Sequence, residues 1–366
     1  MGDARAARAR RGRERFTDPL LYALIRGAIT PAHLASPPTA LHAARKLGRA
    51  FGGMRMNRKR VDKAAERLTV AMPELGPGQR RELVLQSYEH LAMLGIELAI
   101  APRIITEDAW TEAVELGNIK EAMRPLMSDG PTLLLTGHCG NWEILGYTLA
   151  MLGYRMHVLY RPLDLKPADN WVRQTRSKRG LYLLDKFGAM HQLPNLMARG
   201  ESVGFVADQN AGDRGLHVPY FGRLASSYKS IALLAMQFNA RVMVGQARRL
   251  PVGPDEQRGV HYRIELQDTF GPQDWAHHED PMFYITARYR RSIEQLVRSA
   301  PEQYLWMHRI WKSRPRHERL DKPFPELLKD KLRSLPWMTE ESLDALVDRS
   351  DRDRAMMAEQ GITQMK

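Results

Sequence analysis

Apolar positions recur at helical spacing in three stretches of the first hundred residues. They do so over residues 38–52, over residues 58–72 and from about Gln79 to Ile100. Such spacing is typical of amphipathic helices that bury one side. The sequence Gly76-Pro77-Gly78 separates the second stretch from the third, and we expect Pro102 to end the third because proline cannot donate the helical hydrogen bond. The sequence therefore predicts a helical N-terminal part.

From Pro131 onward, short apolar runs alternate with helical stretches. The runs are Thr132 to Thr136, Met156 to Tyr160, Ser202 to Ala207, Arg241 to Ala247 and Tyr262 to Gln267, and the helical stretches cover 141–153, 167–180, 190–200, 228–239 and 281–300. Strands that alternate with helices predict an α/β fold with a mixed, largely parallel central sheet flanked by helices.

Four regions follow from these patterns. We expect a disordered basic tail over residues 1–16 and a helical, membrane-associating region over 17–105. An α/β domain should cover 106–316, followed by a charged, helical C-terminal extension on the surface over 317–366. Near the end of the α/β domain lies an aromatic segment in which we expect Trp306 to pack in the core.

Composition and charge fit a folded protein with anionic partners. The chain has 366 residues, of which 43% are hydrophobic and 27% charged, as in a globular protein that buries a sizeable core. Its net charge of +13 attracts anionic lipid headgroups, an acidic carrier protein or nucleic acid. We do not expect a nucleic-acid partner, because no zinc-finger spacing or RNA-binding aromatic motif accompanies the charge.

The N-terminus is a candidate membrane contact. No stretch reaches the run of about 18 apolar residues that a spanning helix needs. Arginines crowd the first 15 residues, and the apolar stretch from Pro19 to Ile29 is interrupted by Arg26. This pattern fits an amphipathic segment on an anionic membrane surface, and it fits equally a basic tail followed by an ordinary surface helix. The sequence leaves both open.

The most informative stretch runs from Thr132 through His138 to Glu143 and reads as a buried strand, a tight turn and a helix start. Ligands of open α/β sheets bind at the carboxyl ends of strands, where His138 is expected. Histidine is the natural general base near neutral pH, and Glu143 could orient the imidazole and stabilise its charged form. The amides at the helix start could also hold an oxyanion or a phosphate.

This stretch, His138-Cys-Gly-Asn-Trp-Glu143, resembles the His-x4-Asp/Glu signature of the glycerolipid and lysophospholipid acyltransferase superfamily. It is most similar to the form found in the bacterial lipid A biosynthesis lauroyl/myristoyl acyltransferases. Further blocks resemble that family in the same order: Val158-Leu-Tyr-Arg161-Pro-Leu, Arg176 four residues before Gly180, Gly204-Phe-Val-Ala-Asp208-Gln209-Asn, Val218-Pro-Tyr-Phe-Gly222 and Tyr304-Leu-Trp306-Met-His308-Arg309. The resemblance covers about residues 80 to 316.

The resemblance implies a reaction and its substrates. His138 and Glu143 would be the catalytic pair of an acyltransferase, the donor an acyl thioester of acyl carrier protein or coenzyme A, and the acceptor a lipid A precursor or similar glycolipid. A phosphatidylinositol mannoside or a lysophospholipid stays open as the acceptor. It also implies a place on the cytoplasmic face of the bacterial inner membrane, peripheral or N-terminally anchored, although the anchoring helix typical of the family is here short and broken by Arg26.

Further residues are candidates for substrate binding. Arg161 and Arg176 could bind phosphates of the acceptor or of the donor arm, since guanidinium forks suit phosphate. Asp208 ends an apolar strand and should project into the same cleft as His138, where it and Gln209 could bind acceptor hydroxyls; Asp208 could instead pair with an arginine or cap a turn. Asn141, inside the motif, belongs to the same substrate-binding set.

The sequence supports other kinds of site and function less well. We expect no cofactor and no metal, because no zinc-protease helix spacing is present. An acyl-enzyme on Cys139 is not expected, because sequence neighbours rarely have the geometry of a reactive Cys–His pair. A hydrolase would lack the Gly-x-Ser-x-Gly nucleophile elbow. If the chain were instead a non-catalytic basic protein that binds membranes or nucleic acid, replacing His138 by alanine would leave its function intact.

Overall fold

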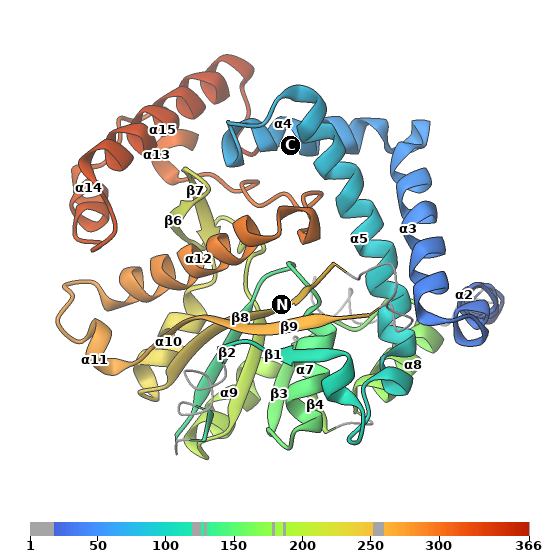
Figure 1. The fold of residues 1–366 in the computed structure, drawn as a ribbon. Coiled ribbons are helices and arrows are strands. Elements are labelled where there is room, and N and C mark those ends of the chain that lie inside the picture. Colours follow the sequence, from blue (N-terminus) through green and yellow to red (C-terminus); the bar gives the residue numbers. More distant parts are fainter. Residues whose placement is uncertain are drawn as a thin grey trace.

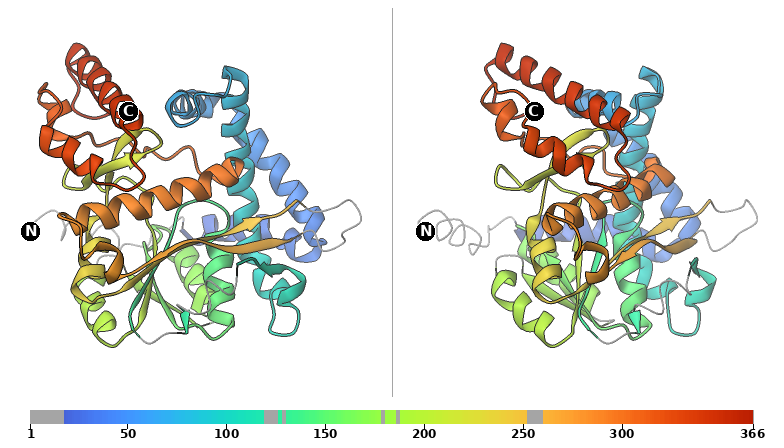
Figure 2. Two further views of the ribbon diagram at one scale, coloured as in Figure 1. Left: turned by 60° about the vertical axis from the view of Figure 1, so that its left-hand side comes forward. Right: turned by 90° about the vertical axis from the view of Figure 1, so that its left-hand side faces the viewer.

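The computed structural model describes residues 18–118, 126–127, 130–177, 180–185, 188–251 and 260–365. A twisted central sheet has helices packed on both faces, with one group of helices at each end of the molecule (Figures 1 and 2). This arrangement confirms the predicted α/β fold with a mixed, largely parallel sheet. The expected disordered tail over residues 1–16 lies outside the described residues.

The sheet has seven strands in the order β1-β9-β8-β2-β5-β3-β4. The strands are β1 (Val114–Leu116), β2 (Thr132–Thr136), β3 (Met156–Tyr160), β4 (Leu181–Asp185), β5 (Ser202–Val206), β8 (Arg241–Arg249) and β9 (Tyr262–Phe270). Five neighbouring strands from β8 to β4 run parallel, whereas β9 pairs antiparallel with β8 and parallel with β1. The carboxyl ends of the five parallel strands therefore share one edge, where β2 leads into His138.

The two faces of the sheet differ. One face carries Leu133, Leu135 and Val203 and packs in the largest hydrophobic cluster with α9 (Ala189–Ala198), α10 (Lys229–Gln237) and α12 (Pro281–Ser299). The other face carries Leu134, Met156 and Val158 and is covered by α7 (Trp142–Met151) and α8 (Lys166–Ser177). Because successive side chains of a strand point to opposite faces, neighbouring leucines of β2 serve these two separate environments.

The N-terminal helices are α2 (Asp18–Leu34), α3 (Pro37–Gly53), α4 (Arg58–Ala71) and α5 (Pro77–Ile104), with the short η1 (Arg55–Asn57) before α4. The last three match the predicted stretches. The prediction that Pro102 ends the third helix is wrong, because α5 continues to Ile104; a proline in the last turn forfeits only one hydrogen bond. Over the described ranges, none of the helices combines the length and apolar character that crossing a bilayer requires.

The C-terminal extension is more than a surface appendage. Its helices α13 (Arg316–Arg319), α14 (Glu326–Arg333) and α15 (Glu340–Gln360) lie over the hairpin β6 (Leu216–Tyr220) and β7 (Arg223–Ser227) (Figure 1). Leu332 and Leu343 are buried in the largest hydrophobic cluster. Fully buried Arg314 pairs with Glu318 and with Asp353 of α15. The extension therefore completes the core, which its high charge had concealed in the sequence.

Candidate functional site

His138 lies in the turn between β2 and α7. Gly140 shapes this turn: its φ is +55°, and a Cβ there would approach the Ala247 carbonyl oxygen to 2.4 Å. The turn is also tied to the aromatic segment that follows α12, since the Leu305 amide donates to the His138 carbonyl at 3.1 Å and the Gly140 amide donates to Gln303 at 3.0 Å. These backbone contacts fix the position of the imidazole.

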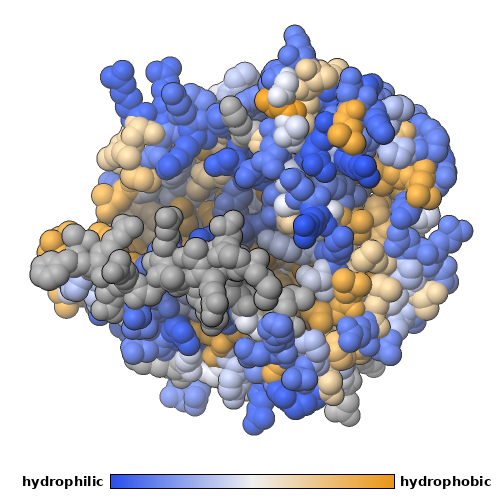
Figure 3. Space-filling view, turned by 180° about the vertical axis from the view of Figure 1, so that it is seen from behind, coloured by the Kyte–Doolittle hydropathy of each residue, from blue (hydrophilic) through white to orange (hydrophobic). Residues whose placement is uncertain are grey.

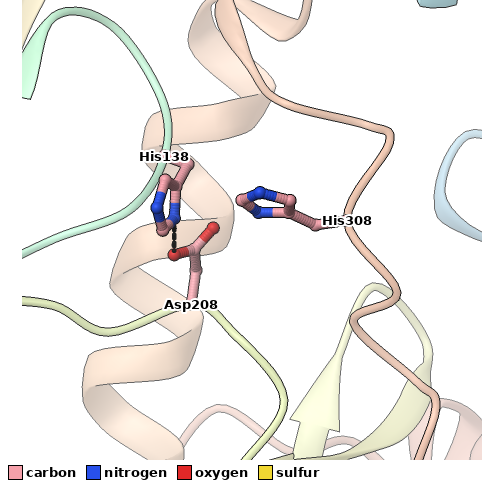
Figure 4. A group of neighbouring side chains, drawn as sticks. All are labelled: His138, Asp208 and His308. Carbon is pink, nitrogen blue, oxygen red and sulfur yellow. Dashed lines mark hydrogen bonds and ion pairs between the residues drawn. The ribbon is translucent and has the colours of Figure 1, made fainter. Parts of the chain in front are cut away.

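The imidazole is paired with Asp208, which follows β5. His138 Nδ1 lies 2.7 Å from Asp208 Oδ1, and the carboxylate is fully buried (Figure 4). Burial alone raises the pKa of a carboxyl, but the facing His138 imidazole outweighs this and holds the pKa of Asp208 below its ordinary value. An ionised Asp208 keeps the proton of neutral His138 on Nδ1, which leaves Nε2 as a proton acceptor. The Gln209 amide nitrogen lies 3.3 Å from that Nε2.

Glu143 takes a different partner. Arg176 of α8 donates from Nε to Glu143 Oε2 at 2.8 Å and from Nη2 to Oε1, and the Trp142 indole donates to the same Oε1 at 3.1 Å. Among the described residues, the carboxylate that bonds His138 is Asp208 and not Glu143. The contact with the imidazole that the sequence suggested for Glu143 is made by Asp208 in this structure.

Asn141 supports the site from behind. Its side-chain oxygen accepts hydrogen bonds from the amides of Glu143 and Ile144, and its amide nitrogen donates to buried Glu97 at 2.7 Å. Asn141 is fully buried and caps the start of α7, while its predicted part in substrate binding stays a prediction. The same contacts occupy amides at the start of α7 that were expected to hold an oxyanion or a phosphate.

His308 also lies in the site, although the sequence predicted no role for it. Its ring packs edge-to-face against His138, with centroids 4.5 Å apart and planes at 84° (Figure 4). Burial, followed by the neighbouring His138, lowers the pKa of His308 to about 4, so its imidazole is neutral at pH 7. It lies 170 residues from His138 in sequence, and only its place in the closing Tyr-x-Trp-x-His-Arg block could have signalled it.

A cavity of about 800 Å³ opens beside His138, between α7 and the sheet face that carries Leu134. Its walls are mostly apolar. Its polar lining includes His138, Glu143, Arg161, Arg176 and Gln209, so four predicted site residues line the cavity together with the histidine. Leu193 of α9 packs in the hydrophobic cluster on the opposite face of the sheet, whereas Ile231 of α10 lines the cavity.

The Cys139 thiol is unreactive although it is adjacent to His138 in the sequence. The side chain is buried, and burial together with the Asp208 charge raises the pKa of the thiol to about 12. A protonated thiol is a poor nucleophile, which supports the expectation that Cys139 forms no acyl-enzyme. Trp306 is buried in the main hydrophobic cluster, which confirms that it packs in the core.

Known proteins share this sequence pattern. Residues 20–313 match the family model described as bacterial lipid A biosynthesis acyltransferase. The lipid A biosynthesis lauroyltransferase of Escherichia coli K12 is 26% identical over 280 residues, which cover 74% of this chain and 85% of the relative. The palmitoleoyltransferase of the same strain is 23% identical over 70% of this chain and 80% of its own length. The lipid A biosynthesis acyltransferase of Haemophilus influenzae is 23% identical over 76% of this chain and 86% of its own length. The chain is therefore an acyltransferase and belongs to the bacterial lipid A biosynthesis acyltransferase family.

Proposed function

We propose that this protein transfers a fatty acyl chain from an acyl thioester to a hydroxyl group of a lipid A precursor or a similar glycolipid. The observation that carries the proposal is the place of His138. His138, whose Nε2 is the proton-accepting nitrogen, lines an apolar cavity of about 800 Å³ together with charged and amide side chains. An acyl chain fits such a cavity, and its thioester would then reach the base.

In the proposed reaction, His138 Nε2 takes the proton of the acceptor hydroxyl while the oxygen attacks the thioester carbon. The ester C–O bond forms, the C–S bond breaks, and the thiolate leaves with the proton that the imidazolium returns. Asp208 stabilises the imidazolium and keeps its Nδ1 proton in place, as the carboxylate of a catalytic triad does. No acyl-enzyme is required, in keeping with a buried Cys139.

Glu143 keeps a proposed part in the reaction through Arg176. Their ion pair forms the polar wall of the cavity, and Glu143 is only 10% exposed. We assign the pair to positioning the thioester end of the donor. Exposed Arg161 lies on the same wall and offers a guanidinium fork to a phosphate of the donor arm or of the acceptor. We assign Gln209 to binding the acceptor hydroxyl, because its amide nitrogen lies 3.3 Å from His138 Nε2.

The proposed partners follow from charge and surface. A net charge of +13 favours an acidic acyl carrier protein as donor and an anionic membrane as the source of the acceptor. Leu20, Leu21 and Leu24 of α2 are at least half exposed. In the view from behind, hydrophobic residues reach the surface at the left edge, on the side where α2 lies (Figure 3). We therefore propose that α2 contacts the cytoplasmic face of the inner membrane.

The test is a transfer assay with purified wild-type protein and the His138→Ala variant. Acyl-carrier-protein donors of several chain lengths are offered with a lipid A precursor as acceptor. We expect acylated lipid from the wild type and a rate at least about 100-fold lower from His138→Ala, the usual weight of a general base. If product forms with a phosphatidylinositol mannoside or a lysophospholipid but not with the lipid A precursor, the acceptor is one of those other lipids. Acceptor-independent thioester loss would indicate a hydrolase.

A further inference from the structure

Three potential metal ligands meet at the centre of the molecule. His138, Asp208 and His308 come from three separate segments, and one nitrogen or oxygen from each lies within 4.8 Å of the others. Figure 4 shows both rings beside the carboxylate, with one carboxylate oxygen bonded to His138 and the other turned toward the gap between the rings. This is the one such group in the part of the chain that the structure describes.

Two atoms of this group lack hydrogen-bond partners. Asp208 Oδ2 is buried on a fully buried side chain and has no partner among the described residues. The Nδ1 atom of half-buried His308 is also buried and also has no partner among those residues. Buried polar atoms nearly always have a hydrogen-bond partner, so two such atoms without partners beside one gap call for an explanation. A carboxylate oxygen and a ring nitrogen that lack protons share one chemistry: both donate an electron pair to a cation.

We propose that His138, Asp208 and His308 form a binding site for a divalent transition-metal ion, zinc above all, and that the bound ion inhibits the enzyme. Two imidazoles and one carboxylate are a ligand set that zinc accepts, leaving a fourth position for water. Zinc sits roughly 2.0–2.2 Å from such ligands, so small rotations of the carboxylate and of the His308 ring must draw the three atoms inward. The buried carboxylate supplies the negative charge that retains the ion.

Inhibition follows from the two ring nitrogens of His138. In the metal-free protein Asp208 holds the imidazole proton on Nδ1, and Nε2 accepts. An ion bound at Nδ1 displaces that proton, which then occupies Nε2 of the same ring. The ring stays neutral and no proton is lost, but Nε2 has become a donor and cannot accept the proton of a hydroxyl. The ion therefore removes the base without blocking the cavity.

The test measures zinc binding directly, on tag-free, full-length protein without substrate, by titration calorimetry. We expect one equivalent of Zn²⁺ to bind the wild type and at least about tenfold weaker binding to His308→Ala. The double variant His277→Ala/His278→Ala is the matched control, because it removes an adjacent histidine pair whose rings lie 4.7 Å apart outside the site. Its affinity should equal that of the wild type.

Cobalt gives an independent measurement. Co²⁺ added to the wild type should produce the intense visible bands of a four-coordinate site, and His308→Ala should not; His308→Gln replaces that variant if circular dichroism finds it unfolded. Equal zinc affinities for the wild type and His308→Ala, absent binding, or a Co²⁺ spectrum like that of the aqueous ion would each overturn the proposal. The measurements use the metal alone, so they stand whatever the acyl acceptor proves to be.

Discussion

Arg176 holds the Glu143 carboxylate with two hydrogen bonds at the wall of the cavity, one of them 2.8 Å long. Glu143 is 10% and Arg176 is 21% exposed. A bidentate pair of this kind fixes both side chains and neutralises the carboxylate. The His-x4-Glu spacing therefore places His138 near an ion pair in the cavity wall, whereas the carboxylate that bonds His138 is Asp208, which follows the neighbouring strand β5.

Replacing Arg176 by alanine should impair transfer. The change leaves Glu143 largely buried without its counter-charge, and hydrogen bonds to charged groups are worth about 1.5–3 kcal/mol. We expect kcat/KM for the acyl donor to fall by roughly 10- to 100-fold. Steady-state kinetics with the donor varied would measure it. Gln174→Ala, an exposed change two residues earlier on α8, should leave the rate near that of the wild type; equal losses in both variants would mean a general defect of α8.

Replacing Asp208 by asparagine should make His138 a less effective base while leaving the imidazole in place. The amide is nearly the same size but no longer fixes the Nδ1 proton, so the wrong tautomer becomes accessible. We expect kcat to fall by about 10² to 10⁴, as when the carboxylate of a triad is neutralised. Asp213→Asn, an exposed change five residues later, is the control. A wild-type kcat for Asp208→Asn in a folded protein would return the orienting role to Glu143.

Periodicity located most of the fold. β2 and β3 have the bounds that their apolar runs predicted, and the long helices differ by a few residues. Strands β1 and β4 were missed for physical reasons: each lies at an edge of the sheet, and each mixes buried with partly or fully exposed positions instead of forming a continuous apolar run. The β6–β7 hairpin was also missed, because the segment from Val218 to Gly222 was used only for the family resemblance and no strand was predicted from it.

The site was predicted in part for a similar reason. His138 follows a strand, and a strand end is visible in the sequence. Its contacts with Asp208 and His308 cross 70 and 170 residues, and no local pattern reports such pairings. Glu143 appeared to be the partner because it is close in sequence, yet the first turn of α7 directs it toward Arg176.

Gly146 offers a way to alter acyl-chain selection. It lies on α7 in the cavity wall, where a Cβ would rest 3.6 Å from Leu181 and 3.7 Å from Met156. Gly146→Ala should therefore fit, whereas Gly146→Leu should narrow the cavity beside Leu181 and Met156. We expect the leucine variant to lower the rate ratio of long to short acyl donors by about tenfold or more, because a misfitting methylene in a hydrophobic pocket is worth ~1–3 kcal/mol. An unchanged ratio in competition assays would place the acyl chain elsewhere.

The exposed leucines of α2 should govern membrane binding. Leu20, Leu21 and Leu24 are 65%, 50% and 64% exposed. Their triple replacement by serine removes apolar contact worth about 1.5–3 kcal/mol for each side chain that inserts fully. We expect at least about tenfold weaker cosedimentation with anionic vesicles, with catalysis on detergent-dispersed acceptor retained. Leu327→Ser is the control, since that leucine is 69% exposed on α14. Equal effects of both changes would argue against α2 as the contact.

His317 should make stability depend on pH. It is buried in α13, and its Nε2 lies 2.9 Å from Ser350 Oγ of α15, so it links the C-terminal helices. Burial, followed by the nearby Arg314 charge, lowers the pKa of His317 to about 4 in the folded protein, whereas the unfolded chain has the ordinary value of about 6.5. Between these values the unfolded chain binds the extra proton. The contribution to stability is therefore full above about pH 6.5 and is lost as pH falls toward 4.

Urea unfolding at a series of pH values measures how steeply the free energy of unfolding rises with pH. This slope should be smaller by up to about 1.4 kcal/mol per pH unit in His317→Gln than in the wild type. It should be unaltered in His191→Gln, where the histidine is exposed. A wild-type slope in His317→Gln would mean that His317 is protonated equally in both states, and that the acid sensitivity comes from other buried histidines such as His217, whose pKa burial also lowers to about 4.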